Sequence, residues 1–86
     1  MFVPGELKNE VITASNANYS LKDMINPTFQ NEGEATVFID GRIVKKGESY
    51  TINAPNVILQ NTISINFDAD GNKSKILYVG FVKTIL

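Results

Sequence analysis

The pair Asp40-Gly41 lies between two runs rich in β-branched and aromatic residues, and it restricts the fold of this chain more than any other feature. An Asp-Gly pair in this setting is the strongest short-range signal for a β-hairpin. A type I′ turn needs a positive φ at both central residues, and these two residue types tolerate it. We therefore predict a hairpin over residues 36–50, onto which the rest of the chain is built.

A second pattern of the same kind follows near the C-terminus. Ile63, Ile65 and Phe67 alternate with polar residues, as in an antiparallel strand with one buried face. The pair Asp70-Gly71 is a candidate two-residue turn that would return the chain beside this strand. The register predicted for this second hairpin pairs Ile65 with Ile76, Ile63 with Tyr78 and Asp68 with Lys73, so that apolar faces apolar and acid faces base.

The returning strand, residues 76–82, is apolar on both faces. A strand buried on both sides needs cover on both sides, and in a chain of 86 residues we expect the second cover to come from another subunit. Gly80, in the middle of this run, would allow a β-bulge or a close backbone approach. This strand is where we predict a protein interface.

The first third of the chain has a less regular pattern. We predict a short strand over residues 9–14, followed by a turn. Residues 19–25 fit either one helical turn capped by Ser20 or, over 17–21, an extended segment. Pro27 ends any helix there, because the residue before a proline is pushed out of the α region.

From residue 28 onward the pattern is β throughout. Besides the two hairpins, it predicts strands at 28–30, 49–53 and 57–60, separated by turns at 31–33 and 54–56. About five to eight short strands fit an all-β fold, a small antiparallel β-sandwich or barrel. We expect a single domain over residues 1–86, with a β core at 27–86 and an N-terminal arm or docking segment at 1–26.

The composition argues against several kinds of chemistry. The chain has no histidine and no cysteine, so it lacks the usual general base near neutral pH, the most reactive nucleophile, disulfides and thiolate metal sites. Eight basic and nine acidic side chains give a net charge of −1, which offers no electrostatic footprint for nucleic acid or an anionic membrane. No apolar run is long enough to cross a bilayer or to form a signal-peptide core. We predict a protein made in the cytoplasm that is not an enzyme and uses no cofactor or metal.

The polar clusters near the second turn have ordinary structural explanations. Ser74 lies between Lys73 and Lys75, but strand alternation puts it on the face opposite both lysines, so we predict a solvated hairpin flank. Residues 68–72 are rich in oxygen ligands, yet the spacing of an EF-hand fails because Gly71 is fourth where a sixth-position glycine is needed. A looser ion site at this turn stays open as an alternative to a plain hairpin turn.

Arg42, Lys45 and Lys46 form the densest basic group. No aromatic residue is interleaved among them to stack nucleic-acid bases. We predict a solvated strand edge that discourages unwanted pairing, rather than an anion-binding site.

The order of features between Phe29 and Ile52 resembles that of small β-sandwich virion structural proteins of tailed bacteriophages. It runs Phe-x-Asn-x-Gly, then Ala-Thr-Val-Phe-Ile-Asp-Gly, then Gly-Glu-Ser-Tyr-Thr-Ile-Asn, followed by a strand and a closing β-hairpin. The resemblance implies a virion protein, made in the host cytoplasm, that acts by symmetric self-association or by docking on a capsid, tail or fibre. The residues that carry it are Phe29, Asn31, Gly33, Thr36, Val37, Ile39, Gly41, Gly47, Glu48, Ser49 and Tyr50.

We therefore expect a structural protein whose partners are proteins, either copies of itself in a homo-oligomer or a larger assembly. The alternative function is a module that binds carbohydrate or a cell-surface ligand, using Tyr19, Tyr50 and Tyr78 with the turn asparagines, although core and turn roles are the more ordinary ones for these residues. The residues predicted to form the protein interface are Ile76, Leu77, Val79, Phe81 and Val82, together with Phe2 and Val3.

Overall fold

The computed structural model describes residues 4–54, 56–69 and 71–85. Within these ranges the chain forms β-strands and no helix, which confirms the all-β class. Every strand pair is antiparallel. The strands are β1 (Gly5–Ile12), β2 (Asn16–Ser20), β3 (Met24–Asn31), β4 (Val37–Ile39), β5 (Arg42–Val44), β6 (Ser49–Thr51), β7 (Thr62–Phe67) and β8 (Leu77–Thr84).

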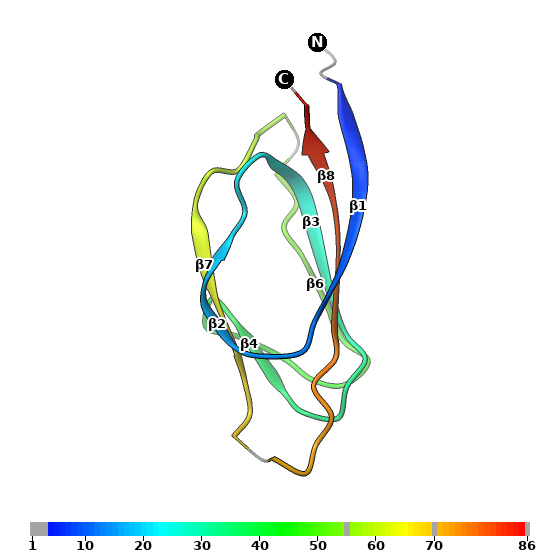
Figure 1. Cartoon of the computed structure of the whole chain (residues 1–86), viewed down its shortest axis with the longest axis vertical. Coiled ribbons are helices and arrows are strands. Elements are labelled where there is room, and N and C mark those ends of the chain that lie inside the picture. Colours follow the sequence, from blue (N-terminus) through cyan, green and yellow to red (C-terminus); the bar gives the residue numbers. More distant parts are fainter. Residues whose placement is uncertain (1–3, 55, 70, 86) are drawn as a thin grey trace.

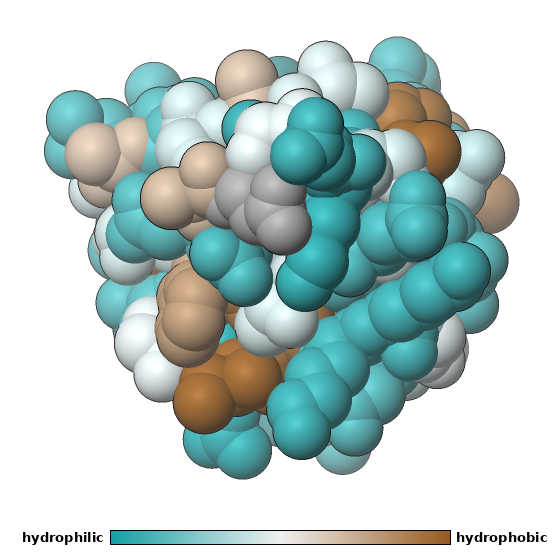
Figure 2. All heavy atoms as spheres, turned by 90° about the horizontal axis from the view of Figure 1, so that it is seen from below, coloured by the Kyte–Doolittle hydropathy of each residue, from teal (hydrophilic) through white to brown (hydrophobic). Residues whose placement is uncertain are grey.

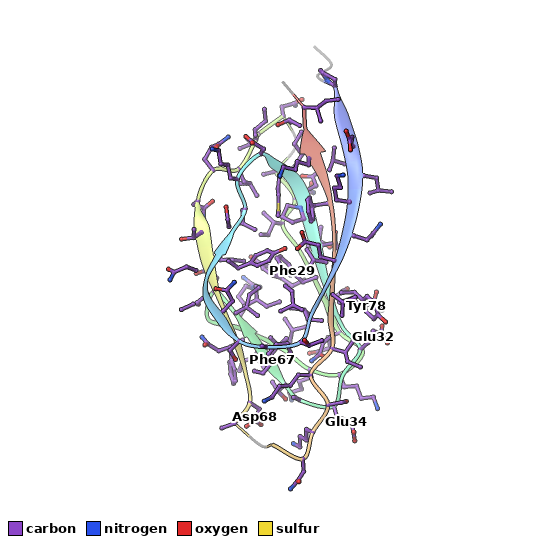
Figure 3. All side chains as sticks on the ribbon, viewed as in Figure 1. Phe29, Glu32, Glu34, Phe67, Asp68 and Tyr78 are labelled. Atoms are coloured by element: carbon purple, nitrogen blue, oxygen red, sulfur yellow. The ribbon has the colours of Figure 1, made fainter. Side chains whose placement is uncertain are left out.

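The strands form two four-stranded sheets that face each other (Figure 1). Sheet A has the order β1-β8-β3-β6, and sheet B has the order β2-β7-β4-β5. Figure 3 shows Phe29 of sheet A and Phe67 of sheet B pointing into the space between the sheets. Burial of apolar side chains in this space is the main term that stabilises such a sandwich. Its core consists of Leu21, Met24, Phe29, Ala35, Val37, Ile39, Val44, Ile63, Ile65, Phe67, Leu77, Val79 and Phe81.

The first predicted hairpin is confirmed. Strands β4 and β5 pair with Val37 opposite Val44 and Ile39 opposite Arg42, so two residues form the turn. Asp40 has a φ of 49° and Gly41 a φ of 84°, the two positive values that a type I′ turn requires.

The second predicted hairpin is wrong, because β7 and β8 lie in different sheets. Strand β7 pairs with β2 and β4, whereas β8 pairs with β1 and β3. The predicted alternation of β7 is nevertheless confirmed, since Ile63, Ile65 and Phe67 are all buried. Alternation specifies which face of a strand is buried but not which strand lies beside it.

The sequence predicts that a second subunit covers one of the two apolar faces of β8, through interface residues that include Leu77, Val79 and Phe81. Leu77, Val79 and Phe81 are buried in the core, so sheet B covers that face and these three residues are unavailable to a partner subunit. Tyr78 and Val82 point the opposite way and are exposed. The expected irregularity is in β3 rather than in β8: Ile25 pairs with Val82 and Thr28 with Gly80, so Asn26 and Pro27 lie opposite the single residue Phe81.

The first 26 residues also differ from the prediction. In their described part, β1 pairs with β8 and β2 with β7, so they are strands of the sandwich rather than a separate arm. The extended alternative near residues 17–21 is confirmed, and the helical turn is wrong. Pro27 lies inside β3 at the bulge, a place where a missing N–H breaks no ladder bond. The strand expected at 9–14 begins earlier and ends at Ile12.

The strand predicted at residues 57–60 is not formed. Only an isolated bridge joins Leu59 to Met24. The backbone of this segment bonds to the turn before β3 instead: Asp23 N–H donates to the Leu59 carbonyl, and Leu21 N–H donates to the Asn61 carbonyl. These bonds close one end of the sandwich.

The side chain of Asn31 joins the two sheets from inside. It is fully buried at the end of β3, and its amide nitrogen donates to the carbonyls of Ala35 at 2.9 Å and of Val44 in sheet B at 3.0 Å. Its oxygen accepts from Gly33 N–H at 3.0 Å. Three buried backbone groups are therefore paired by one side chain, which meets the requirement that buried polar groups be hydrogen-bonded.

Replacing Asn31 with alanine should lower the free energy of unfolding by about 2–4 kcal/mol, because it removes three hydrogen bonds to buried backbone groups and leaves the Ala35 and Val44 carbonyls without their amide donor. Urea denaturation measures the change. Asn66→Ala, on the exposed face of β7, is the matched control and should change stability by less than about 0.5 kcal/mol. An Asn31→Ala variant as stable as Asn66→Ala would contradict the proposed role of the amide.

Candidate interaction face

The outer face of sheet A carries two exposed apolar pairs, separated by Asn9 and Gly80. In the β1–β8 register Leu7 lies opposite Val82 and Val11 opposite Tyr78. All four side chains are on the face turned away from sheet B, because the intervening residues of β8 are buried in the core. Leu7 is 74% exposed and Val11 54% exposed, values that are high for large aliphatic side chains on one face of a strand. We call Leu7, Val11, Tyr78 and Val82 the outer patch.

The outer patch contains one of the interface residues predicted from the sequence, Val82, and adds three that were not among them: Leu7, Val11 and Tyr78. Leu7 was missed because residues 1–8 lack the β-branched enrichment that marks strands, whereas Val11 was placed in the strand predicted at residues 9–14 but not in an interface. The available signal was the alternation of Leu7, Asn9 and Val11 with charged residues. Ile76 is half-buried just before β8. Phe2 and Val3 lie outside the described residues, so their part in an interface stays a prediction.

The opposite face of β1 is charged. Lys8 Nζ lies 3.0 Å from a carboxylate oxygen of Glu6, and both side chains are about half exposed. The next residue on this face, Glu10, accepts a hydrogen bond of 2.7 Å from the hydroxyl of Tyr19 in β2. That bond ties the edge strand of sheet A to the edge strand of sheet B.

Burial raises the pKa of Tyr19 above its ordinary value of 10.0, and the hydrogen bond and negative charge of Glu10 raise it further. The hydroxyl therefore keeps its proton at pH values where a tyrosine in the unfolded chain loses it. Tyr19 is a structural donor in this position.

A shallow hollow of about 220 Å³ lies over Gly80 on the outer face of sheet A. Its polar lining comes from Asn9, Glu10, Thr28 and Gln30, and Tyr78 also lines it. A Cβ atom at position 80 would lie 3.2 Å from the side-chain oxygen of Asn9, so the glycine leaves room for this amide to lie across β8. The hollow combines an aromatic ring with amide and hydroxyl groups.

A larger hollow, of about 430 Å³, lies at the side of the sandwich between β1 and β2. Acidic and basic side chains line it together, including Glu10, Lys22, Asp23 and Lys83. Two acidic and two basic side chains balance each other in this lining, so the hollow offers no net charge that would select an anion or a cation.

The three tyrosines do not gather into one sugar-stacking surface. Tyr19 and Tyr50 both pack against the buried ring of Phe29, at centroid distances of 6.3 Å, the first edge-on and the second stacked. Arg42 lies with its guanidinium carbon 5.1 Å from the Tyr50 ring centre. Only Tyr78 stands free on the outer face, where Figure 3 shows it pointing away from the space between the sheets.

The other sequence candidates have structural roles or are solvated. The hydroxyl oxygen of Ser74 accepts from Glu34 N–H at 3.0 Å, and Lys45 and Lys46 are exposed beside the edge strand β5. Asp70 is outside the described residues, so an ion site at residues 68–72 stays an open alternative.

In the described ranges no group of three or more His, Cys, Asp or Glu side chains could hold a metal ion, and no helix is long and apolar enough to span a membrane.

Figure 2 looks at the end of the sandwich that lies lowest in Figure 1. That end is mainly hydrophilic, and hydrophobic atoms appear there only in small separate groups. The candidate face for a partner is therefore the side formed by sheet A rather than this end.

Comparisons of the chain with protein-family models, with curated proteins and with solved structures find no match. The case for a function therefore depends on the geometry of the outer patch and on the resemblance carried by residues 29–52.

Raising the pH above 10 should destabilise the fold in part through Tyr19. The folded protein keeps the hydroxyl proton that the unfolded chain releases, so this contribution to stability is complete below pH 10.0 and is lost as the pH rises toward the raised pKa of the folded state. Urea denaturation of wild type and Tyr19→Phe at about pH 8 to 11 measures the effect, since phenylalanine has no proton to lose. Equal losses in both proteins would contradict the assignment.

Proposed function

We propose that this protein is a non-enzymatic structural module that acts by self-association or by docking on a larger assembly, through sheet A. The observation that carries the proposal is the outer patch, where two pairs of exposed apolar or aromatic side chains, Leu7 with Val82 and Val11 with Tyr78, lie on one face of a regular sheet. Exposed apolar surface gathered on one face of a small domain favours an interaction site, because leaving it in water costs free energy that a partner recovers.

The same proposal assigns the larger assembly to a virion. Support comes from the resemblance of residues 29–52 to small structural proteins of tailed bacteriophages, in which a capsid, tail or fibre is the partner. Asn31, Gly33, Gly47 and Glu48 of that pattern meet at one place in the sandwich: Gly33 N–H donates to the Asn31 side chain, Gly47 N–H donates to the Asn31 carbonyl, and Asn31 N–H donates to the Glu48 carbonyl. The pattern thus corresponds to a single packing motif.

Replacing Leu7 with serine should weaken self-association at least about tenfold, because it removes the most exposed apolar side chain of the outer patch from the interface. Sedimentation equilibrium and light scattering over a concentration series measure the association. Ile43→Ser is the matched control: Ile43 is 60% exposed on β5 of sheet B and should leave association unchanged. A wild-type protein that stays monomeric at high concentration would remove self-association from the proposal and leave docking alone.

A carbohydrate-binding module is the second candidate, and the hollow over Gly80 favours it. A tyrosine ring beside amide and hydroxyl side chains can stack on a sugar and bond its hydroxyls. In this candidate the ligand contacts Tyr78, Asn9 and Gln30, which the structure places around one hollow.

Under the second candidate, Tyr78→Ala should abolish binding on a broad glycan array while leaving the thermal unfolding midpoint within about 4 °C of wild type. Phe38→Ala is the matched control, since Phe38 is a partly exposed aromatic residue on the other sheet and should leave glycan binding intact. An array with no bound glycan, or binding that survives Tyr78→Ala, would count against this function.

A further inference from the structure

We infer that the partner is a second copy of this chain, and that the two copies join by antiparallel pairing of their β1 strands across a two-fold axis at Asn9. The inference deepens the proposed function and depends on it, because it names the partner and the geometry of the self-association. It is carried by the free edge of β1 and by the order of residues along that strand.

Strand β1 is the least protected edge of the sandwich. It is eight residues long, pairs with β8 over its whole length without a register shift, and has no strand on its other side. Seven of its residues, 5–11, are exposed. An edge of this kind presents a row of backbone N–H and C=O groups that is ready to pair with another strand.

The other three edges carry features that discourage such pairing. Strands β5 and β6 have only three residues each, and Lys45 and Lys46 follow β5 directly. Strand β2 is interrupted by a register shift between Asn16 and Tyr19. Short length, lysines and irregular register are the usual means by which sheets avoid edge-to-edge association. Strand β1 is long and regular, and its one lysine, Lys8, is paired with Glu6.

Two copies of β1 are complementary in one register. A two-fold axis perpendicular to the sheet keeps each face of the strand on the same side in both copies, so outer residues meet outer residues. Centred on Asn9, the pairing places Leu7 opposite Val11 of the partner subunit on the outer face. On the charged face it places Lys8 opposite Glu10 of the partner subunit. Apolar pairs and opposite charges directly across a strand pair both stabilise it.

The neighbouring registers lack this combination of apolar pairs and opposite-charge pairs. Centred on Lys8, the pairing would put two lysines face to face and Glu6 opposite Glu10 of the partner subunit, and like charges in these positions destabilise a strand pair. Centred on Leu7, it would oppose Glu6 and Lys8 but pair only residues 5–9 of the described strand and leave Val11 uncovered. Of these three registers, only the one centred on Asn9 sets Lys8 opposite Glu10 of the partner subunit and also uses both aliphatic residues; in it Glu6 lies opposite Ile12 of the partner subunit.

The pairing would extend sheet A through the dimer. Two four-stranded sheets would become one continuous sheet of eight strands, with β1 and its copy at the centre. The outer patches of the two copies would then join into one apolar surface across the axis. An apolar surface of twice the area is better suited to docking on a larger assembly. The dimer would therefore serve both self-association and docking, the two ways of acting named in the proposed function.

Cysteine cross-linking tests the register directly, because the chain has no cysteine of its own. Residues that face each other in an antiparallel pair have Cα atoms about 4.5–5.5 Å apart, within the range of a disulfide. Under mild oxidation Asn9→Cys should form a covalent dimer in high yield. Leu7→Cys is the control: in this register its two copies lie about 13 Å apart along the strands and should not cross-link. Cross-linking of Leu7→Cys but not Asn9→Cys would overturn the register.

Charge exchange gives a second, non-covalent test. Lys8→Glu alone puts Glu opposite Glu10 at both symmetric positions, and Glu10→Lys alone puts Lys opposite Lys8, so each variant should dimerise at least about tenfold more weakly than wild type. In an equimolar mixture every opposing pair is again acid and base, and the dimer should return to within about threefold of the wild-type dissociation constant. Circular dichroism verifies that each variant is folded, since Glu10→Lys also loses the bond from Tyr19.

The outcomes separate this inference from the proposed function. A wild-type dimer that resists both single charge variants, with no Asn9→Cys cross-link, overturns β1 pairing but leaves self-association through another surface. A monomeric wild type at high concentration overturns the inference, and docking alone remains of the proposed function. Weakened single variants, a restored mixture and the Asn9→Cys dimer together support it.

Discussion

The buried amide of Asn31 is the contact on which the arrangement of this sandwich depends. The chain leaves sheet A at the end of β3 and enters sheet B a few residues later, so it must bury several backbone groups at the crossing. One amide pairs with Gly33, Ala35 and Val44, which fixes the path between the sheets and the position of the first hairpin. Apolar packing alone gives two sheets a common core but does not determine how the chain passes between them.

A close contact of the same crossing explains why Gly33 is a glycine. A Cβ atom there would lie 2.6 Å from the backbone nitrogen of Ile76 and from the carbonyl oxygen of Ser74, closer than side-chain carbons approach backbone atoms. The segment that leads into β8 thus packs directly on the segment that follows β3. This contact holds β8 in the middle of sheet A, and β8 in turn supports β1 at the edge.

The exposure of the outer patch follows from the position of β1. The strand adds to sheet A beyond the region that sheet B covers, and of its eight residues only Ile12 is even partly buried. Its charged face meets solvent and Tyr19, while Leu7 and Val11 on its apolar face lie beside Val82 and Tyr78 and are largely exposed in the described part of the chain. The outer side chains of β1 are not part of the core of the sandwich. The alternation of aliphatic and charged residues on that strand is therefore not explained by core packing in the monomer.

The sequence alone determined the features that depend on one segment. The Asp40-Gly41 turn follows from backbone sterics at two residues, and the buried face of β7 follows from the alternation of its own side chains. The tertiary structure decided which strands are neighbours: it put β7 and β8 in different sheets, turned residues 57–60 into a cap and used Asn31 as a bridge between sheets. It also exposed Leu7 and Val11 together with Val82, a juxtaposition of residues about 70 positions apart that no local pattern contains. Local sequence patterns indicate which face of a strand is buried. Which strands lie beside it depends on the packing of the whole core.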